Sequence, residues 1–598
     1  MRAPRRKTIA GALLAALFLA AIALAGNNLS GTSTRSASLN VSHMSGPASQ
    51  FASSTGSTKG TPAAPSKGAN PQGITVGRSY KNAISPPARS LVQSHGTGQL
   101  QARPELPLLV AGKPLRQAND PVVQDTMPTP KMPSPILNFP GIPFPGVVCN
   151  CAPPDTNGEV GLTQYVQIVN EGFQVFDKTT GIEEAPAVAI SSLWTGFGGL
   201  CEFNGFGDPV VVYDQLANRW VITQFAGPIP ITDQCIAVST GSDALGTYAV
   251  YGFHMTDNFY DYPKFGVWPD AYYASANIFN AQGTAFLGPQ AYAFDRDAML
   301  AGDPATFIAA PMGSPSDDSY MPADLDGLVP PPAGAPNPYV SIGVLSTWPV
   351  HRFHVDFDNP LNSTFDLVGT LTPAPFTPFF AGIPQLGVGD QLDSLADRGM
   401  FRNAYRNFGD HEALVGNITV SSGGVAGVRW FEVNNVTSGT PAFTQQGTYQ
   451  PDSTYRWMGS VAMDGNSNLS LGFSASSTSI FPQIRYAGRL AGDPPGDLSQ
   501  GEEHLFDGTG SQTDTVSRWG DYSDMTVDPV DDCTFWYTQE YYETTSSFNW
   551  RTRVGNFKFP TCTAAARRRR TSRLSQPRIT RSPATFATRT ATRSRTQR

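Results

Sequence analysis

Residues 209–225 read PVVVYD, then QLAN, then RWVITQF. The two apolar runs have the length of β-strands, and the four residues between them have the composition of a tight turn, so this stretch predicts a β-hairpin. Two more short apolar runs follow, CIAVST at 235–240 and TYAVYGF at 247–253. Together the four runs predict one four-stranded antiparallel unit.

The same kind of start precedes several such units. An aromatic residue, one further residue and an aspartate occur together at Asp208, Asp261, Asp410 and Asp521. The copies at Asp261 and Asp521 also share the longer pattern Asp-Tyr-x-x-apolar-x-Val-x-Pro. Asp155 lies 53 residues before Asp208, which lies 53 residues before Asp261. These spacings indicate a repeat.

The repeat determines the expected fold. With two units allowed around the Pro-rich insertion at 330–338, unit starts fall near residues 155, 208, 261, the 340s, 410, 458 and 521. Four-stranded units at this spacing predict an all-β protein, a β-propeller of about seven blades, with six to eight possible. A tandem of β-sandwiches is the competing fold, but it does not explain the repeated aspartate. We expect the propeller to occupy residues 136–562.

The segments on either side of this region differ in composition. Residues 1–25 combine a basic start with an apolar run and a small-residue cleavage pattern, which is typical of a signal peptide; an uncleaved anchor is the alternative. Residues 26–135 are rich in Ser, Thr, Gly, Pro and Ala and predict a disordered linker. The Arg-rich residues 563–598 predict a disordered tail, either an arm for polyanions or a segment without function.

Charge limits the partners of the propeller region. Residues 136–562 carry 45 acidic and 16 basic residues. Such a surface repels nucleic acid and anionic membranes, and it suits neutral or cationic ligands or a divalent cation. After the signal segment, no run is long and apolar enough to span a bilayer. We therefore expect a secreted or periplasmic monomer without a membrane span.

Six cysteines lie between residues 149 and 562. An even number of cysteines in an exported chain favours disulfides over a metal site. Proximity in the sequence suggests the pairs Cys201–Cys235 and Cys533–Cys562, among the 15 pairings that six cysteines allow.

One turn carries a resemblance to a known class. Residues 528–536, DPVDDCTFW, resemble a degenerate Asp-box, the strand-turn-strand signature of sialidase-like propellers, in which Asp532 or Cys533 replaces the turn glycine. Residues 208–214 and 261–270 are similar to segments of exported bacterial propeller proteins. The resemblance covers about residues 150–562. It implies a propeller architecture and a class that includes glycosidases, but a fold does not carry an activity with it.

The repeated aspartates are the main candidate site. In a propeller, the loops that enter the innermost strands lie at one mouth of the central channel, so Asp208, Asp261, Asp410 and Asp521 should line one rim, with Asp155 as a fifth member. Carboxylates this close together either have raised pKa values or are neutralised by a cation such as Ca²⁺, for which these four are the expected ligands. The structural alternative is that each aspartate caps a turn.

Catalysis by this rim would follow the logic of paired carboxylates in glycoside hydrolysis. Asp208, Asp261 or Asp521 would act as base or pKa modulator, and Glu412 or Glu540 as acid. The candidate ligand-binding residues are Arg402, Arg406, His411, Arg518 and Trp519. The arginines are included because guanidinium groups bind carboxylates through two hydrogen bonds; the alternative is that they pair with acids of the protein itself.

The sequence does not provide a complete catalytic set. We therefore expect a secreted or cell-surface binding or adhesion protein whose ligand is a glycan or cell-envelope material. The alternative is a sialidase-like glycoside hydrolase that uses the rim carboxylates. Whether the protein is an enzyme stays open at this stage.

Overall fold

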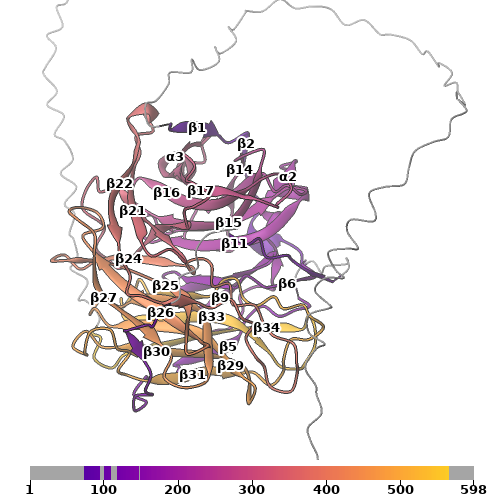
Figure 1. Cartoon of the computed structure of the whole chain (residues 1–598). Coiled ribbons are helices and arrows are strands. Elements are labelled where there is room, and N and C mark those ends of the chain that lie inside the picture. The colour runs from indigo at the N-terminus through magenta and orange to yellow at the C-terminus, as the bar shows by residue number, and fades with distance from the viewer. Residues whose placement is uncertain (1–72, 94–99, 109–117, 147–148, 564–598) are drawn as a thin grey trace, which may run out of the picture. The chain divides into compact units, whose positions relative to one another are not determined.

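The computed structural model describes residues 73–93, 100–108, 118–146 and 149–563 (Figure 1). Strands dominate these residues, and the α-helices among them are the short α2 (Leu200–Phe203) and α3 (Arg296–Ala301). The expected signal peptide, the linker before residue 73 and the tail after residue 563 lie outside the described residues. No helix in the described ranges has the length and apolar character needed to cross a membrane.

Groups of four sequential strands form the body, and each group is called a blade. Blade 1 consists of β7 (Asn157–Val160), β8 (Gln164–Val169), β9 (Gly172–Asp177) and β10 (Val188–Ala189), and blade 2 of β11 (Gly205–Asp214), β12 (Arg219–Ala226), β13 (Asp233–Ser239) and β14 (Tyr248–His254). Blade 3 consists of β15 (Phe259–Val267), β16 (Ala271–Phe279), β17 (Phe286–Asp295) and β18 (Thr306–Ala309), and blade 4 of β19 (Ser319–Asp326), β20 (Asn337–Ile342), β21 (Trp348–His354) and β22 (Thr364–Leu371).

Three further blades complete the body. Blade 5 consists of β24 (Asn403–Asn407), β25 (Glu412–Ser422), β26 (Val425–Asn434) and β27 (Ala442–Tyr449), and blade 6 of β28 (Tyr455–Met463), β29 (Leu469–Ser477), β30 (Ile480–Arg489) and β31 (Glu502–Asp507). Blade 7 consists of β32 (Asp524–Val527), β33 (Thr534–Tyr542) and β34 (Trp550–Lys558) with β5 (Leu137–Pro140). Within each blade the four strands pair antiparallel in order, and successive side chains of a strand point to opposite faces of the blade.

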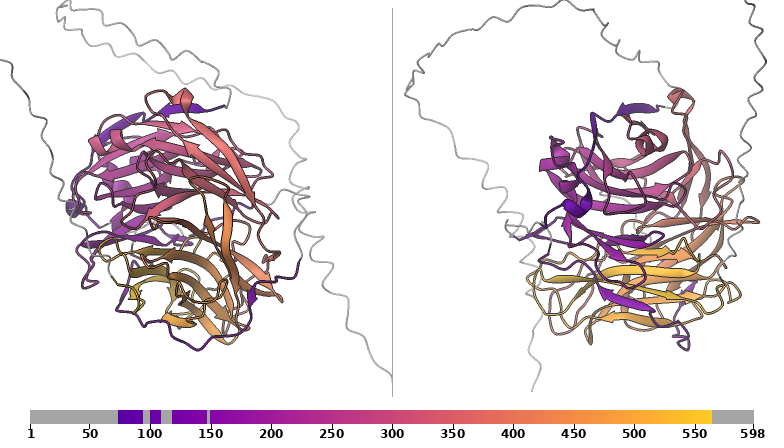
Figure 2. Two further views of the ribbon diagram at one scale, coloured as in Figure 1. Left: turned by 90° about the vertical axis from the view of Figure 1, so that its left-hand side faces the viewer. Right: turned by 180° about the vertical axis from the view of Figure 1, so that it is seen from behind.

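The blades close into a ring. The first strand of each blade contacts the first strand, or the first hairpin, of the next, and β32 of blade 7 contacts β7 of blade 1. Between blades 4 and 5 this contact is a parallel pair of strands, β19 with β24. In Figures 1 and 2 the yellow strands of blade 7 lie beside the purple strands of blade 1. The described residues therefore form a seven-bladed β-propeller, which confirms the predicted fold class.

Blade 7 takes its outermost strand from the other end of the ring. β5 pairs antiparallel with β34, and Leu137 lies opposite Asn556. Because β5 precedes blade 1 in the sequence, this pairing joins the two ends of the ring through backbone hydrogen bonds. Four residues of mixed character do not predict such a pairing.

Part of the segment expected to be a linker also pairs with blade edges. β1 (Thr75–Arg78) pairs with β18, β2 (Lys81–Ile84) with β14, and β4 (Val123–Gln124) with β27. This differs from the expectation for residues 26–135. The outer edge of a sheet offers free backbone N–H and C=O groups, which an extended segment of almost any composition can satisfy. The composition of this segment, which is rich in small and polar residues, therefore does not predict its strands.

Most predicted unit starts agree with the inner strands, which begin at residues 157, 205, 259, 319, 403, 455 and 524. Two do not. Blade 4 begins at Ser319, ahead of the Pro-rich insertion, which connects β19 to β20. Blade 5 begins at Asn403, and Asp410 lies in the turn between β24 and β25. Prolines gather in a loop inside the blade because proline cannot donate to a strand ladder.

All nine tryptophans are buried in the core, and this corrects the expectation for Trp519. The Trp519 side chain has no solvent exposure, its Nε1 donates a hydrogen bond to Ser474 Oγ at 3.1 Å, and its ring stacks on Tyr542. A large indole whose N–H finds an internal acceptor is more stable inside than at a wet rim. Trp519 therefore packs between blades and offers no surface to a ligand.

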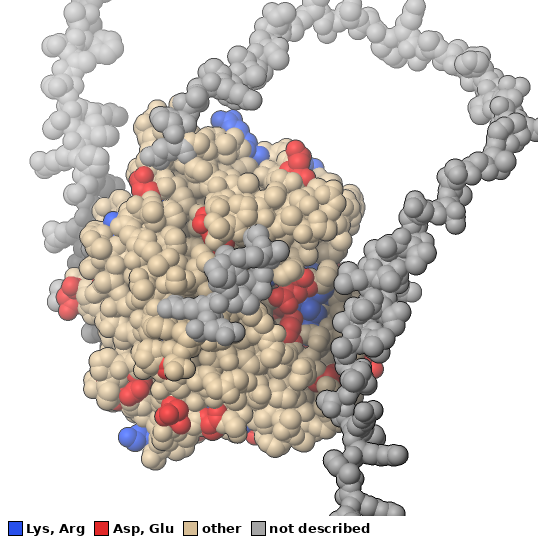
Figure 3. All heavy atoms as spheres, in the orientation of Figure 1, with Lys and Arg blue, Asp and Glu red and all other residues tan. Residues whose placement is uncertain are grey.

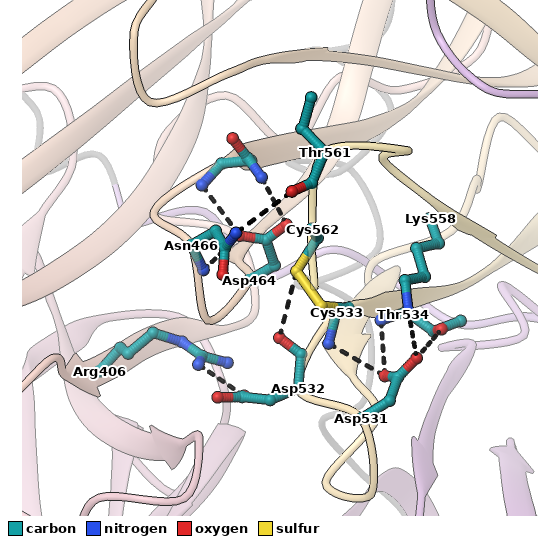
Figure 4. Close-up of a disulfide and its surroundings, with 11 residues drawn as sticks. Arg406, Asp464, Asn466, Asp531, Asp532, Cys533, Thr534, Lys558, Thr561 and Cys562 are labelled. Carbon is teal, nitrogen blue, oxygen red and sulfur yellow. Dashed lines mark hydrogen bonds and ion pairs between the residues drawn. A yellow bond between two sulfur atoms is a disulfide. The ribbon is translucent and has the colours of Figure 1, made fainter. Parts of the chain in front are cut away.

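Disulfides join Cys201 to Cys235 and Cys533 to Cys562, the two pairs suggested by sequence proximity, and a third joins Cys149 to Cys151. Disulfides persist in oxidising compartments, which fits a location outside the cytoplasm. Figure 4 shows the Cys533–Cys562 bond at the turn between β32 and β33.

That turn is the segment that resembles an Asp-box. The Asp531 carboxylate accepts hydrogen bonds from the backbone N–H groups of Cys533 and Thr534, as a turn-capping aspartate does. Asp532 has a φ of 58°, so an aspartate adopts the left-handed conformation that glycine usually provides. The Asp532 carboxylate also pairs with Arg406 at 2.6 Å (Figure 4). Arg406 is thus occupied by a structural ion pair and does not reach the rim.

Candidate functional site

Four aspartates from four adjacent blades line one cavity. Asp155 precedes β7, Asp208 lies in β11, Asp261 lies in β15 and Asp521 precedes β32. These belong to blades 1, 2, 3 and 7, which are neighbours in the ring. The free volume between them is about 150 Å³. We call this space the aspartate cavity.

A shared backbone irregularity brings these carboxyls inward. The β11–β12 and β15–β16 pairings each skip residues beside Asp208 and Asp261, so both inner strands bulge there. Asp155, Asp208 and Asp521 have φ values of 51°, 40° and 59°. Aspartate tolerates this left-handed region better than most residues. The repeated motif therefore reflects a repeated bulge, and Met458 adopts the same conformation in blade 6 without supplying a carboxyl.

Several polar atoms of the cavity have no protein partner. Oδ1 of Asp155 and Oδ1 of Asp521 are buried and accept no hydrogen bond from the described residues. The Asp261 carboxyl forms no hydrogen bond or ion pair with them. Asp208 accepts one long hydrogen bond, from the Tyr522 hydroxyl at 3.5 Å. Since a buried polar group without a partner costs about 1–3 kcal/mol, these atoms favour a ligand that pairs with them.

Burial and mutual repulsion change the protonation of these groups. Burial first, then the negative charges of Asp208 and Asp521, raise the pKa of Asp155 well above its usual value. Burial and Asp208 likewise raise the pKa of Asp261 to about 7, although Arg398 opposes the shift. For Asp208, burial raises the pKa, while the positive charges of Lys264 and Arg103 lower it. Burial thus favours the protonated form of Asp155, Asp208 and Asp261 more than water does.

Lys264 places a buried amine beside these carboxyls. Its Nζ lies 3.1 Å from the ring centroid of Tyr262 and 3.5 Å from that of Tyr522, and it donates to the Pro263 carbonyl at 3.3 Å. Burial lowers the pKa of this amine well below its usual value, against the opposing effect of Asp208. The two aromatic faces favour the charged form of this amine and so oppose the effect of burial.

A short segment from before the propeller covers one side of the cavity. We call residues 101–108 the strap. Its first residues, β3 (Gln101–Ala102), pair with β6 (Cys151–Ala152). The carbonyl of Arg103 accepts a hydrogen bond from Arg518 Nε at 2.7 Å, and the carbonyl of Leu106 accepts one from Arg398 Nη2 at 2.7 Å. The strap thereby contributes Arg103, Glu105 and Leu106 to the lining.

The arginines of the cavity differ in how they are paired with protein groups. Arg398 pairs with Asp397, and Arg518 pairs with both Asp393 and Asp521. Arg103 pairs with Glu171 through Nη2, but its buried Nη1 has no hydrogen-bond partner among the described residues. Arg103 therefore keeps a buried N–H group that no described residue binds.

Much of the remaining lining is apolar. It includes the rings of Phe206, Phe225 and Phe259, together with Leu106 and Ile229. Ile229 is 64% exposed, so the apolar wall reaches the surface. An apolar wall opposite a few convergent polar groups is the usual composition of a small-molecule site.

The cavity does not have the geometry of the expected Ca²⁺ site. In the part of the chain that the structure describes, no three His, Cys, Asp or Glu side chains are grouped to hold a metal ion. Lys264, Arg103 and Arg518 lie among the aspartates and already oppose their charge. Cationic side chains in these positions take the place that a divalent cation would need.

Asp410, His411 and Glu412 lie away from the cavity. Asp410 is fully exposed in a turn, where its carboxylate pairs with His411 at 2.7 Å. The His411 ring stacks on Phe408. Glu412 accepts hydrogen bonds from the Tyr405 hydroxyl and from Thr437 within blade 5. These three expectations are corrected, because the motif Phe-Gly-Asp forms a hairpin turn in blade 5 and not an inner-strand bulge.

Arg402 belongs to a second buried cluster, which we call the Arg402 cluster. Its Nε donates to Asp324 at 2.8 Å, and its Nη1 donates to Asp326 at 3.1 Å and to the Met525 carbonyl at 3.2 Å. The positive charge of Arg402 also acts on the nearby carboxyls of Glu159 and Asp524, whose pKa values it lowers against the effect of burial. Arg402 is therefore a structural cation and does not line the aspartate cavity.

Glu540 lies beneath the turn that carries Asp521. Its Oε2 accepts a hydrogen bond from the Gly520 N–H at 2.7 Å, and burial raises its pKa well above the usual value. The side chain has no solvent exposure. Glu540 thus supports the Asp521 turn and does not itself line the cavity.

Sequence reasoning missed Arg103, Glu105, Arg398 and Lys264. Arg103 and Glu105 lie in a segment expected to be disordered, and no local pattern marks them. Lys264 offered a signal, because it is the one basic residue inside the motif that repeats at Asp261 and Asp521.

Charged side chains are sparse on the visible face of the molecule, where uncharged atoms cover most of the surface (Figure 3). Buried charged side chains include several in the aspartate cavity and in the Arg402 cluster.

Comparisons with known proteins add limited information. No protein-family model and no curated protein matches the sequence. Among solved structures, the chain is similar to phage phi92 endosialidase (10% identity, TM-score 0.33, covering 65% of this chain and 70% of that one). It is also similar to Penicillium chrysogenum α-L-arabinanase complexed with arabinobiose (11%, 0.32, 60% and 99%). A third is Drosophila Plexin A in complex with Semaphorin 1b (6%, 0.34, 71% and 88%). Likeness at this level concerns the fold alone.

Proposed function

We propose that the protein acts outside the cytoplasm as a glycan-binding propeller, and that the aspartate cavity takes a sugar unit of its ligand. The observation that carries this proposal is the set of unpaired atoms in the cavity: Oδ1 of Asp155 and Asp521, the Asp261 carboxyl and Nη1 of Arg103. Sugar hydroxyls both donate and accept, so they can pair with carboxylate oxygens and with a guanidinium at once.

The apolar wall supports the same class of ligand. A sugar ring has an apolar face of C–H groups and an edge of hydroxyls. The cavity is lined by the rings of Phe206, Phe225 and Phe259 as well as by the carboxyls. This combination of apolar and polar groups matches the two kinds of surface of a sugar ring. The cavity volume of about 150 Å³ is below the roughly 300–1,000 Å³ of sites for drug-sized ligands, which favours a single unit.

The test is binding by the full mature chain to a panel of defined oligosaccharides, followed by calorimetric titration of the members that bind. Asp261→Ala removes a carboxyl that forms no hydrogen bond or ion pair with the described residues, so the fold should be unaffected. Loss of a hydrogen bond to a charged group, about 1.5–3 kcal/mol, should weaken binding at least tenfold.

Asp410→Ala is the matched control, since Asp410 has the same local motif but lies outside the cavity. Asp155→Asn is a second variant, because asparagine also tolerates the left-handed backbone at that position. The proposal is wrong if no panel member binds, or if Asp261→Ala and Asp155→Asn both bind as tightly as the control.

Glycoside hydrolysis is the second candidate, and the raised pKa of Asp261 favours it. A carboxyl with a pKa of about 7 beside other carboxyls has the property of a general acid at neutral pH. The same panel should be incubated with the protein and analysed for reducing ends. The protein is an enzyme if it releases product, if Asp261→Ala abolishes this turnover, and if the rate declines as pH rises above about 7. If the oligosaccharides bind but no product forms, the protein acts as a binding protein only.

A further inference from the structure

A second cavity adjoins the aspartate cavity, and we call it the side cavity. It has a free volume of about 360 Å³. Glu105 of the strap lines both cavities. Phe380, Asp393, Ser394, Asp397 and Ser517 also line the side cavity.

The wall between the two cavities is thin and consists of ion pairs. Arg518 lines the aspartate cavity, and it pairs with Asp393, which lines the side cavity. Arg398 and Asp397 repeat this arrangement, with Nε and Oδ1 2.7 Å apart. The Glu105 carboxylate completes the wall 3.9 Å from Arg398, and its side chain is 32% exposed.

Hydrogen bonds hold the strap in place where it crosses this wall. Arg518 and Arg398 hold the carbonyls of Arg103 and Leu106, which flank Glu105, and the Leu108 N–H donates to Asp397 at 2.9 Å. The same two arginines therefore position the aspartates, the strap and the boundary between the cavities. Because each is tied on both sides, the boundary is a preorganised part of the site.

We propose that the side cavity is a second subsite for the same ligand, so that two consecutive sugar units bind on either side of Glu105. This inference rests on the proposed function. Phe380, 43% exposed, provides an apolar face in the side cavity, which Ser394 and Ser517 also line. The side cavity therefore combines apolar and polar groups, as the aspartate cavity does.

The two subsites contribute differently to affinity. In the side cavity the carboxylates already have partners, since Asp393 pairs with Arg518 and accepts from the Trp519 N–H, and Asp397 pairs with Arg398. In the aspartate cavity several atoms have none. The aspartate cavity therefore anchors the first unit by hydrogen bonds, and the side cavity adds the stacking of a second unit on Phe380.

The experiment measures affinity against ligand length. The probes are the mono-, di-, tri- and tetrasaccharides of the sugar series whose binding Asp261→Ala weakens, titrated into the full mature chain. We expect affinity to rise about tenfold from one unit to two and then to stay constant. Phe380→Ala should reduce the disaccharide affinity to the monosaccharide value, whereas Asp261→Ala should weaken every member.

Phe203→Ala is the matched control, because Phe203 is also an exposed phenylalanine, at 71%, and lines neither cavity. Equal affinity for one and two units, or a gain in affinity that survives Phe380→Ala, would overturn the second subsite while leaving glycan binding intact. A panel without any binder would instead remove the proposed function, and this inference with it.

Discussion

The aspartate cavity and the Arg402 cluster both gather acidic residues around arginine, but they place the cation differently. In the Arg402 cluster the guanidinium is central, 1% exposed, and bonded to Asp324, to Asp326 and to a backbone carbonyl. In the aspartate cavity the arginines lie at the edge, where Arg398 and Arg518 bond to acids and to the strap. In the first arrangement the guanidinium is fully engaged by protein groups. In the second, carboxyl oxygens remain that no described residue binds.

Raised carboxyl pKa values do not separate the two regions. Burial raises the pKa of Glu159 and Asp524 beside Arg402, and it raises the pKa of Asp155 and Asp261 in the cavity. Desolvation acts on any buried carboxyl, whatever its role. The difference lies in the space that the unpaired atoms face, because a cavity admits a ligand and a packed cluster does not.

The largest expected effect comes from breaking the Arg402 cluster. Arg402→Met removes the partner of two buried aspartates, and uncompensated buried charge typically costs about 3–5 kcal/mol. Urea denaturation should show this loss of unfolding free energy. Arg402→Lys keeps the charge but not the fork of hydrogen bonds, so it should recover part of the loss. A change below about 1 kcal/mol in Arg402→Met would mean that the cluster does not stabilise the fold.

A smaller effect of opposite sign is expected at Asp261. Its folded pKa of about 7 lies above the roughly 3.9 of an unfolded aspartate, so the folded state holds the proton more tightly. Stability from this group is present below pH 4 and is lost as pH rises from about 4 to 7. Asp261→Asn should therefore stabilise the protein by about 1–2 kcal/mol at pH 8, after a discount for its partial exposure, and by nothing at pH 3.5.

The measurement is the unfolding free energy of both proteins from urea titrations across this pH range, where the protein remains folded. Asp410→Asn serves as the control, because the pKa of Asp410 is lowered by His411 and has no such upward shift. If Asp261→Asn shows the same stability difference at both pH values, the Asp261 carboxyl is not repelled in the folded state.

The strand runs, the turns and the repeated aspartate predict the propeller and bring Asp208, Asp261 and Asp521 together, because these signals are local. The strap could not be predicted, since its anchors, Arg398 and Arg518, lie about 300 and 415 residues away in the sequence. Its own residues have no strand or helix period. Long-range pairing of backbone carbonyls leaves no trace in the composition of a segment.

Asp410 shows where a local motif fails. Phe-Gly-Asp at 206–208 and at 408–410 is the same tripeptide, yet Asp208 adopts a φ of 40° in a bulge and Asp410 lies in an exposed turn. The tripeptide fits both conformations, because glycine permits the positive φ that each copy has, at Gly207 and at Gly409. Only the partner strand decides which conformation forms.

The smallest expected effect tests this difference directly. Asp410→Ala removes a fully exposed carboxylate whose partner His411 is itself half exposed, and surface charges of this kind contribute little. The thermal midpoint and the affinity for the best panel ligand should both stay within experimental error. A loss of affinity in Asp410→Ala similar to that in Asp261→Ala would place a ligand contact on blade 5. The aspartate cavity would then be only one part of a wider binding face, and the bulge would no longer distinguish functional from structural copies of the motif.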